Sequence, residues 1–447
     1  MINFKIEKNI LYKCKTDEEI IVIPENIQII EAGAFRNQQT IKKIIMHSNI
    51  IKIKEEAFKK CFNLTEINLP EDLEVISNYS FAQCVLLKDI NLPNNLKEIG
   101  EYAFYKCASL ENISFKDKLE VIRRNAFDQC VNLKAINLKD NIKKINSNAF
   151  DGIGIETINL PKSLEYVEES LFLNLKNLKE INIHPDNLYY QSINGVLYSK
   201  DFKELIAYPQ AKDDNEFIFP KDILEIRAKA FCHQKYLKKI ILNDGLITIG
   251  AEAFNDCSVL NNIYLPESLQ NIKYCAFCNC TSLESIKLPK KITEINGNLF
   301  NNCISLKEIT FEGIINRIYE KAFFNCALIE KFDFKEGLLS ISSYVFKDTN
   351  LSDLTLPKSL VKVSENFLGG INDGLKINYL GNSKKWEELV SDKKESVSGP
   401  SLNDYHYYGA NVDKIIPTDY KDICIVKKDF KYSVYCHEDD TLLVYPK

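Results

Sequence analysis

A single motif recurs along this chain at a nearly constant spacing. The pair Ala-Phe, or a close variant of it, appears 14 times, and most neighbouring copies lie 23 residues apart. The phenylalanines stand at positions 35, 58, 81, 104, 127, 150 and 172, and then at 231, 254, 277, 300, 323, 346 and 367. A fixed period of this length is typical of stacked repeats, so the 447 residues are expected to form one long solenoid rather than about three globular domains.

The repeat unit is clearest between Leu64 and Leu86, where it has the form L-x-x-I-x-L-P-x-x-L-x-x-I-x-x-x-(A/S)-F-x-x-C-x-x. The alternation in Ile67-Asn68-Leu69 predicts a short strand with one buried face, and the proline after it ends the strand. The i, i+3 spacing of Phe81 and Cys84 predicts a helical turn or two at the back of each coil. Stacked in register, 15 such strands are expected between Ile23 and Leu356, with a sixteenth at Ile377–Tyr379.

This 23-residue L-P … I-x-x-x-A-F-x-x-C unit resembles the BspA-like, or treponemal-type, leucine-rich repeats, over about residues 17 to 410. The resemblance implies an α/β solenoid: a curved, right-handed superhelix or horseshoe with a parallel inner β-sheet and short outer helices. The segment Leu375–Trp386 is similar to the end-cap pattern of the family, in which the single tryptophan would plug the open end of the core.

The interval of 59 residues between Phe172 and Phe231 equals two units and 13 extra residues. Its Asn194-Gly195 turn between apolar segments predicts small β-hairpins, and the N-terminal segment Phe4–Tyr12 resembles this insert. We therefore divide the chain as follows: an N-terminal cap hairpin (1–16), a first repeat arm (17–185), a hairpin insert (186–214), a second repeat arm (215–370), a C-terminal cap (371–410) and a C-terminal strand extension (411–447).

The 14 cysteines are compatible with disulfides, a metal site or a reducing compartment. Eight of them occur three residues after a repeat phenylalanine, a position that Ile153 and Leu175 fill in other units, so they are expected to be free, buried packing residues. The other six are Cys14, Cys232, Cys275, Cys278, Cys424 and Cys436. The group Cys275-x-x-Cys278-x-Cys280 has the look of a metal site, but no second pair follows at zinc spacing, so no metal or other cofactor is expected.

The sequence gives little support to other classes of function. The net charge is −5 and only five residues are arginines, which argues against nucleic-acid binding. No apolar stretch predicts membrane insertion, and no catalytic motif or convergent set of carboxylates predicts an enzyme. The lack of an N-terminal signal segment and the many free cysteines favour the cytoplasm, whereas the family resemblance implies the cell surface or the extracellular space as the alternative.

The exposed strand positions offer the best candidate for a binding site. In the first arm the central exposed residue of each strand is mostly Asn, which predicts a ladder of stacked amides (Asn68, Asn91, Ser114, Asn137, Asn159 and Asn182). In the second arm the same face carries mixed charge and apolar side chains, so we place the candidate partner-binding face on Lys239, Ile241, Tyr264, Lys287, Glu308, Thr310, Lys331 and Asp333.

The sequence therefore predicts a non-enzymatic scaffold for protein–protein recognition through its concave strand face, with a protein ligand that it does not identify and with the monomer as the favoured state. The alternatives are a passive structural or assembly protein, or a surface adhesion protein that binds host or matrix proteins. A metal-binding or enzymatic protein is the weakest of the possibilities.

Overall fold

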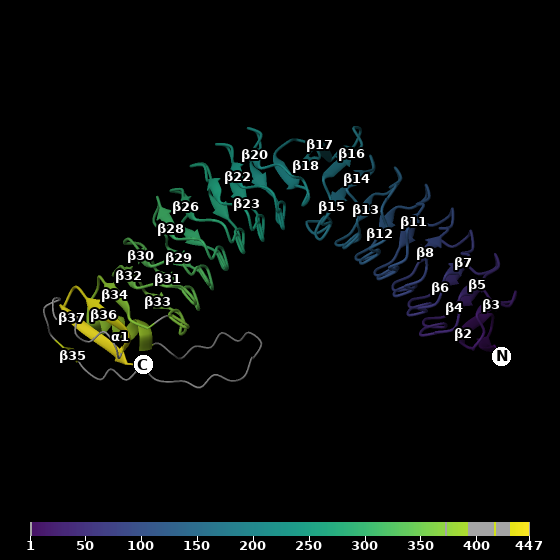
Figure 1. Ribbon diagram of the computed structural model, residues 1–447, viewed down its shortest axis with the longest axis horizontal. Coiled ribbons are helices and arrows are strands. Elements are labelled where there is room, and N and C mark those ends of the chain that lie inside the picture. The colour runs from purple at the N-terminus through teal and green to yellow at the C-terminus, as the bar shows by residue number, and fades with distance from the viewer. Residues whose placement is uncertain (1, 372, 392–414, 417–429, 447) are drawn as a thin grey trace. The chain divides into compact units, whose positions relative to one another are not determined.

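The computed structural model describes residues 2–371, 373–391, 415–416 and 430–446, and the chain forms two compact units (Figure 1). Unit 1 comprises residues 1–213 and 226–235, and unit 2 comprises residues 214–225 and 236–447. Both units are built from stacked coils of parallel strands, as the repeat period predicts.

Each coil of unit 1 contributes to two parallel ladders, where the sequence predicts only one. The expected ladder contains β3 (Ile20–Val22), β5 (Lys43–Ile45), β7 (Glu66–Ile67), β9 (Asp89–Ile90), β11 (Asn112–Ile113), β14 (Thr157–Leu160) and β16 (Glu180–Ile183). The second contains β4 (Ile29–Ile30), β6 (Lys52–Ile53), β8 (Val75–Ile76), β10 (Glu98–Ile99), β12 (Val121–Ile122), β13 (Lys144–Ile145) and β15 (Tyr166–Val167). The expected slot at Ile136–Leu138 forms no strand among the described residues, although both of these side chains are buried.

Unit 2 repeats this arrangement. Its expected ladder contains β20 (Glu216–Ile218), β22 (Lys239–Ile241), β24 (Asn262–Tyr264), β26 (Ser285–Leu288), β28 (Glu308–Phe311), β30 (Lys331–Asp333), β32 (Asp353–Leu356) and β34 (Leu375–Tyr379). Its second ladder contains β23 (Thr248–Ile249), β25 (Asn271–Ile272), β27 (Glu294–Ile295), β29 (Arg317–Ile318), β31 (Ser340–Ile341) and β33 (Lys362–Val363). The short strand β21 (Glu225–Ile226) spans the boundary between the two units.

The prediction of helical turns and short outer helices at the back of the coils is wrong, because the described repeats have tight turns there and no outer helix. In the coil around Phe58, the amides of Glu56, Phe58 and Lys60 donate to carbonyls of the next coil, while those of Lys59 and Cys61 donate to carbonyls three residues earlier. Glu56 and Lys60 also have positive φ angles of 58° and 62°, which an α-helix does not tolerate. The amides that an α-helix would use internally therefore hold neighbouring coils together.

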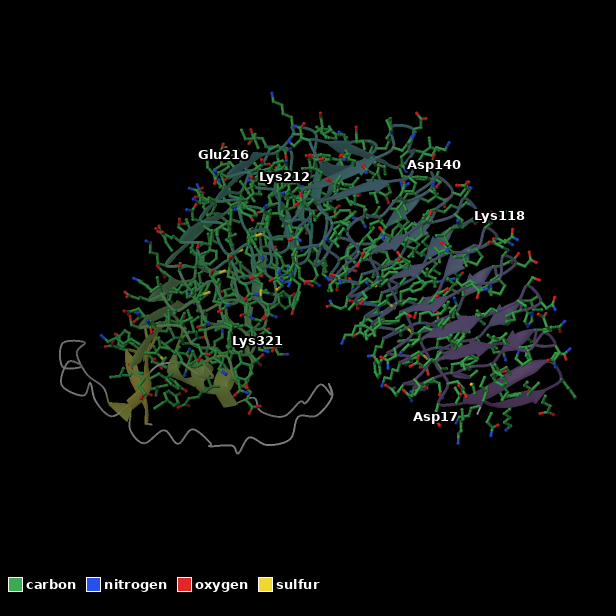
Figure 2. All side chains as sticks on the ribbon, turned by 45° about the vertical axis from the view of Figure 1, so that its right-hand side comes forward. Asp17, Lys118, Asp140, Lys212, Glu216 and Lys321 are labelled. Carbon is green, nitrogen blue, oxygen red and sulfur yellow. The ribbon has the colours of Figure 1, made fainter. Side chains whose placement is uncertain are left out.

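The repeat phenylalanines form a continuous stack in the core of unit 1. Rings from Phe35 to Phe150 follow one another at centroid separations of 5.1 to 5.8 Å, with interplanar angles of 23° or less. All of these phenylalanines are fully buried. Charged side chains such as Lys118 and Asp140 instead point away from the ribbon (Figure 2). The apolar positions of the period thus build one core along the unit.

Hairpins close the unit at the places that the sequence predicts. At the N-terminus β1 (Asn3–Glu7) pairs antiparallel with β2 (Ile10–Lys15). In the insert β17 (Tyr190–Ile193), β18 (Val196–Ser199) and β19 (Glu204–Ala207) form an antiparallel meander. The two elements form the same pair of backbone hydrogen bonds with the coil that follows. At the N-terminus the carbonyl of Leu11 accepts from Glu31, and the amide of Cys14 donates to Ala34. In the insert the carbonyl of Leu205 accepts from Arg227, and the amide of Tyr208 donates to Ala230.

The C-terminal cap contains the one α-helix of the described chain, α1 (Ser383–Ser391). Its Trp386 is fully buried against Tyr379 and Phe367, and its indole nitrogen donates to the hydroxyl of Tyr445 at 3.1 Å. Strand β36 (Phe430–Cys436) continues the sheet beside β34, followed by β37 (Thr441–Pro446) and β35 (Ile415–Ile416). The predicted plug and the strand at residues 432–435 are confirmed, whereas the predicted loop at 391–403, apart from Ser391, and the strand at 423–426 lie outside the described residues.

Removing one ring from the phenylalanine stack tests how much the core contributes. We expect Phe104→Ala to lower the free energy of unfolding by about 3–5 kcal/mol, because it leaves a cavity between Phe81 and Phe127. Val131→Ala, at an apolar side chain that is 49% exposed, should change it by less than about 0.5 kcal/mol. Chemical denaturation of the two variants makes the comparison, and equal losses would contradict a continuous core.

Candidate functional site

All eight residues of the predicted binding face belong to unit 2, on β22, β24, β26, β28 and β30. Their side chains point to solvent, while the alternate residues Ile240, Ile263 and Ile286 are buried. The register places Ile241 beside Tyr264 and Lys287 beside Thr310. The structure thus brings neighbouring members of the set together, on a surface that the backbone ladder holds in place.

One further residue, which the sequence pattern did not single out, belongs to this face. Ile218 on β20 pairs with Ile241 and is 64% exposed, and Tyr264, on the far side of Ile241, is 55% exposed. These three residues form what we call the apolar strip of unit 2. The signal was present in the sequence, since Phe217-Ile218-Phe219 places an apolar residue at the outward position of its strand.

Unit 1 has a smaller patch of the same kind on its first coils, which the sequence analysis also missed. Ile20 and Val22 on β3 are 57% and 59% exposed, and Val22 pairs with the partly exposed Ile45 on β5. The amide ladder expected further along is present only in part. Asn182 donates to Asn159 at 3.3 Å, but the side chain of Asn68 bonds to the backbone of Met46 instead.

Two of the predicted lysines are held by carboxylates on the same face. The ammonium nitrogen of Lys239 lies 3.0 Å from Glu216, and that of Lys287 lies 2.9 Å from Glu312. The hydrogen bond between Lys287 and Glu312 lowers the pKa of Glu312 and raises the pKa of Lys287. Exposed pairs of this kind add little stability, but they fix the position of charges that a partner would meet.

A pocket of about 350 Å³ opens between β28 and β30. Four predicted residues line it: Glu308 and Thr310 from β28, and Lys331 and Asp333 from β30. Three aromatic rings also line it, Phe311, Phe332 and Phe334, with Phe311 and Phe334 5.7 Å apart between centroids. The pocket therefore combines an apolar interior with charged groups at its mouth.

The pocket lies at a break in the expected ladder, where β28 and β30 each bond to their other neighbour. On one side the amide of Glu312 donates to Leu288, and Gly313 lies so close to the preceding coil that a Cβ atom there would stand 2.3 Å from the carbonyl oxygen of Lys290. On the other side the amide of Phe334 donates to Thr355. Within the described chain β28 and β30 thus belong to different sheets, while the second ladder continues unbroken from β27 to β33.

The repeat cysteines have a different role. Seven of them donate their thiol to the carbonyl oxygen of a repeat phenylalanine in the preceding coil, at 3.0 to 3.2 Å. Burial raises the pKa of the Cys61 thiol to about 12, and it raises the pKa values of Cys84 and Cys107 well above the usual value. All 13 cysteines of the described residues are buried, and Cys424 lies outside them.

No group of three or more His, Cys, Asp or Glu side chains in the described residues could hold a metal ion. Over the same residues no helix is long and apolar enough to cross a membrane.

These features define a leucine-rich repeat β-solenoid, and comparison with known proteins identifies its type. The chain belongs to the family described as "BspA type Leucine rich repeat region (6 copies)", whose model matches residues 4–130, 97–205, 207–328 and 252–372. No curated protein has a sequence that matches this chain.

Several solved bacterial structures share the fold. A leucine-rich cell surface protein from Faecalibacterium prausnitzii is 21% identical, with a TM-score of 0.62 over 88% of this chain and 97% of that one. A leucine-rich repeat protein from Eubacterium ventriosum is 22% identical, with a TM-score of 0.59 over 80% and 92%. The pneumococcal vaccine antigen PcpA is 23% identical, with a TM-score of 0.54 over 87% and 94%.

The close approach at Gly313 can be tested by substitution. We expect Gly313→Ala to lower the free energy of unfolding by about 1–3 kcal/mol, because the new methyl group would collide with the backbone of Lys290. Gly154→Ala is the matched control, since the nearest atom to a Cβ there is 3.7 Å away. Thermal or chemical unfolding measures both, and a Gly313→Ala variant as stable as the control would contradict the tight contact between Gly313 and Lys290.

Proposed function

We propose that this chain is a non-enzymatic scaffold that recognises a protein partner through the strand face of unit 2. The observation that carries the proposal is the apolar strip, in which the exposed side chains of Ile218 and Tyr264 flank the partly exposed Ile241 on the same series of coils as the pocket between β28 and β30. The family is one of repeat proteins, which supports binding rather than catalysis.

The chemistry of this face suits a protein ligand. Exposed tyrosine and isoleucine side chains are the kind of apolar anchor that dominates protein interfaces, and the ion pairs of Lys239 and Lys287 provide the polar rim around them. Because these residues lie on hydrogen-bonded strands, the face loses little conformational freedom on binding. The pocket then offers room for an apolar side chain of the partner, with Lys331 and Asp333 beside it.

The names of the structural neighbours bear on where such a scaffold would act. One is called a cell surface protein and another a vaccine antigen. These names favour display outside the cell, and the cytoplasmic location expected from the sequence finds no support among them. We therefore propose an extracellular or surface-exposed scaffold, which also agrees with the alternative implied by the family resemblance.

Partner capture tests the placement of the site. The purified wild-type protein, immobilised, should retain a set of proteins that the combined variant Tyr264→Ala, Lys287→Ala, Lys331→Ala retains at least about tenfold less, since loss of one anchor is worth about 1.4 kcal/mol or more. Quantitative mass spectrometry of the captured proteins gives the ratio.

The matched control changes the same strand positions in unit 1, as Asn91→Ala, Ser114→Ala, Asn159→Ala. These side chains are exposed, and we expect capture by this variant to equal that of the wild type. Equal capture by all three proteins would contradict a site on unit 2, and loss only in the unit 1 variant would move the site to the other unit.

Self-association distinguishes a binding scaffold from an assembly protein. Strand β1 lies at the edge of its sheet, where a register shift between Lys5 and Ile6 and the exposed charges of Lys5 and Glu7 oppose pairing with another copy. We expect light scattering over a wide concentration range to give a constant monomer mass. A mass that rises with concentration would favour the passive assembly function.

A further inference from the structure

The outer turn of each coil brings two particular side chains into contact. They stand two residues before and one residue after the repeat phenylalanine, at the ends of an i to i+3 turn. Direct contact between these two positions recurs in coils of both units, as an ion pair, as amide hydrogen bonds or as an edge-to-face ring pair: Glu56 with Lys59, Asn125 with Asp128, Asn298 with Asn301, and Tyr102 with Tyr105.

In one coil both of these positions are cysteine. Cys275 and Cys278 flank Phe277, and the amide of Cys278 donates to the carbonyl of Cys275 at 3.2 Å. A turn closed in this way holds its terminal Cα atoms within about 7 Å, which overlaps the span of a disulfide. The fold thus places two thiols at positions whose side chains touch in other coils.

The two sulfur atoms already interact. The thiol of Cys275 forms a side-chain hydrogen bond to Cys278 that lowers the pKa of Cys278, although burial and the carboxylates of Glu252 and Asp256 act in the opposite direction. A thiol with a lowered pKa forms the reactive thiolate more readily. The exchange can therefore begin at Cys278.

The other cysteines of this region are chemically different. Cys280, only two residues further on, has no exposed surface and donates to the carbonyl of Phe254, and burial raises its pKa well above the usual value. Cys303 in the next coil is likewise fully buried, donates its thiol to the carbonyl of Phe277, and has a pKa that burial raises well above the usual value. Cys275 and Cys278 are 8% and 7% exposed, so a small reagent meets them before it meets the core thiols.

We propose that Cys275 and Cys278 form a reversible disulfide across the outer turn in the presence of a low-molecular-weight disulfide such as oxidised glutathione. The Cys278 thiolate attacks one sulfur of the reagent, and the first glutathione leaves as thiolate. Cys275 then loses its proton to solvent and attacks the Cys278 sulfur, which releases the second glutathione. Two protein thiols are oxidised and one small disulfide is reduced to two thiols.

Peptide mapping tests the proposal on the intact chain. The reduced protein is incubated with oxidised glutathione, alkylated with N-ethylmaleimide in denaturant and digested with trypsin, which releases residues 274–287 with Cys275, Cys278 and Cys280 together. We expect a peptide alkylated at Cys280 alone and lacking about 2 Da from the unmodified pair. Alkylation of all three cysteines, or a disulfide that includes Cys280, would overturn the proposal.

Two variants separate the steps. In Cys275→Ser the second attack is impossible, so we expect glutathione to stay attached to Cys278; no adduct there would contradict Cys278 as the attacking thiol. Cys232→Ser is the matched control, because Cys232 occupies the Cys278 position of another coil in which Lys229 takes the place of Cys275. It should leave the disulfide of the 274–287 peptide unchanged, and loss of that disulfide would show that the pair does not act alone.

Discussion

The structure depends on hydrogen bonds between neighbouring coils, above all those made by the outer turns. In the coil of Phe58, alternate amides leave their own segment and bond to the next coil. This pattern requires residues with positive φ on both sides of the phenylalanine, such as Glu56 and Lys60, at a cost that no helix would impose. These hydrogen bonds recur in coil after coil, and together they offset the strain of the positive φ angles, which a single repeat could not do. The period of 23 residues keeps the bonding groups of neighbouring coils in register.

This constraint explains which parts of the fold were predictable. The apolar period located the coils and the first strand ladder, because those features depend on which side chains are buried, whereas the buried tryptophan of the cap was expected only from the family resemblance. It did not distinguish a helix from a turn, since Phe81 and Cys84 have the same i, i+3 spacing in either. The second ladder was missed for a related reason. Val75–Ile76 is a strand of two residues, too short to show alternation, and only its neighbours define it.

The candidate site also has a part that could be predicted from the sequence and a part that could not. Tyr264 and Ile241 are neighbours at outward positions of their strands, which the alternation of buried and outward residues in the sequence is enough to predict. The pocket between β28 and β30 could not be found from the residues that line it. It depends on which neighbouring coil each strand bonds to, and the residues of one repeat do not specify that. A repeat sequence shows which residue occupies each position of a coil. It does not show whether a strand bonds to the preceding coil, to the following coil or to both.

The cysteines fall into two groups that differ in their chemistry according to their position in the coil. A cysteine three residues after the repeat phenylalanine has its sulfur committed to packing and to a carbonyl of the preceding coil, as Cys303 does with Phe277. At the outer turn the repeat does not require a cysteine, since Asn, Lys, Tyr and Glu fill these positions in other coils. Positions that the ladder does not use are the ones at which side chains vary, on the outer turn as on the strand face. Function in a solenoid of this kind is therefore to be sought where neighbouring coils differ, and Cys275 with Cys278, like Ile241 with Tyr264, are such places.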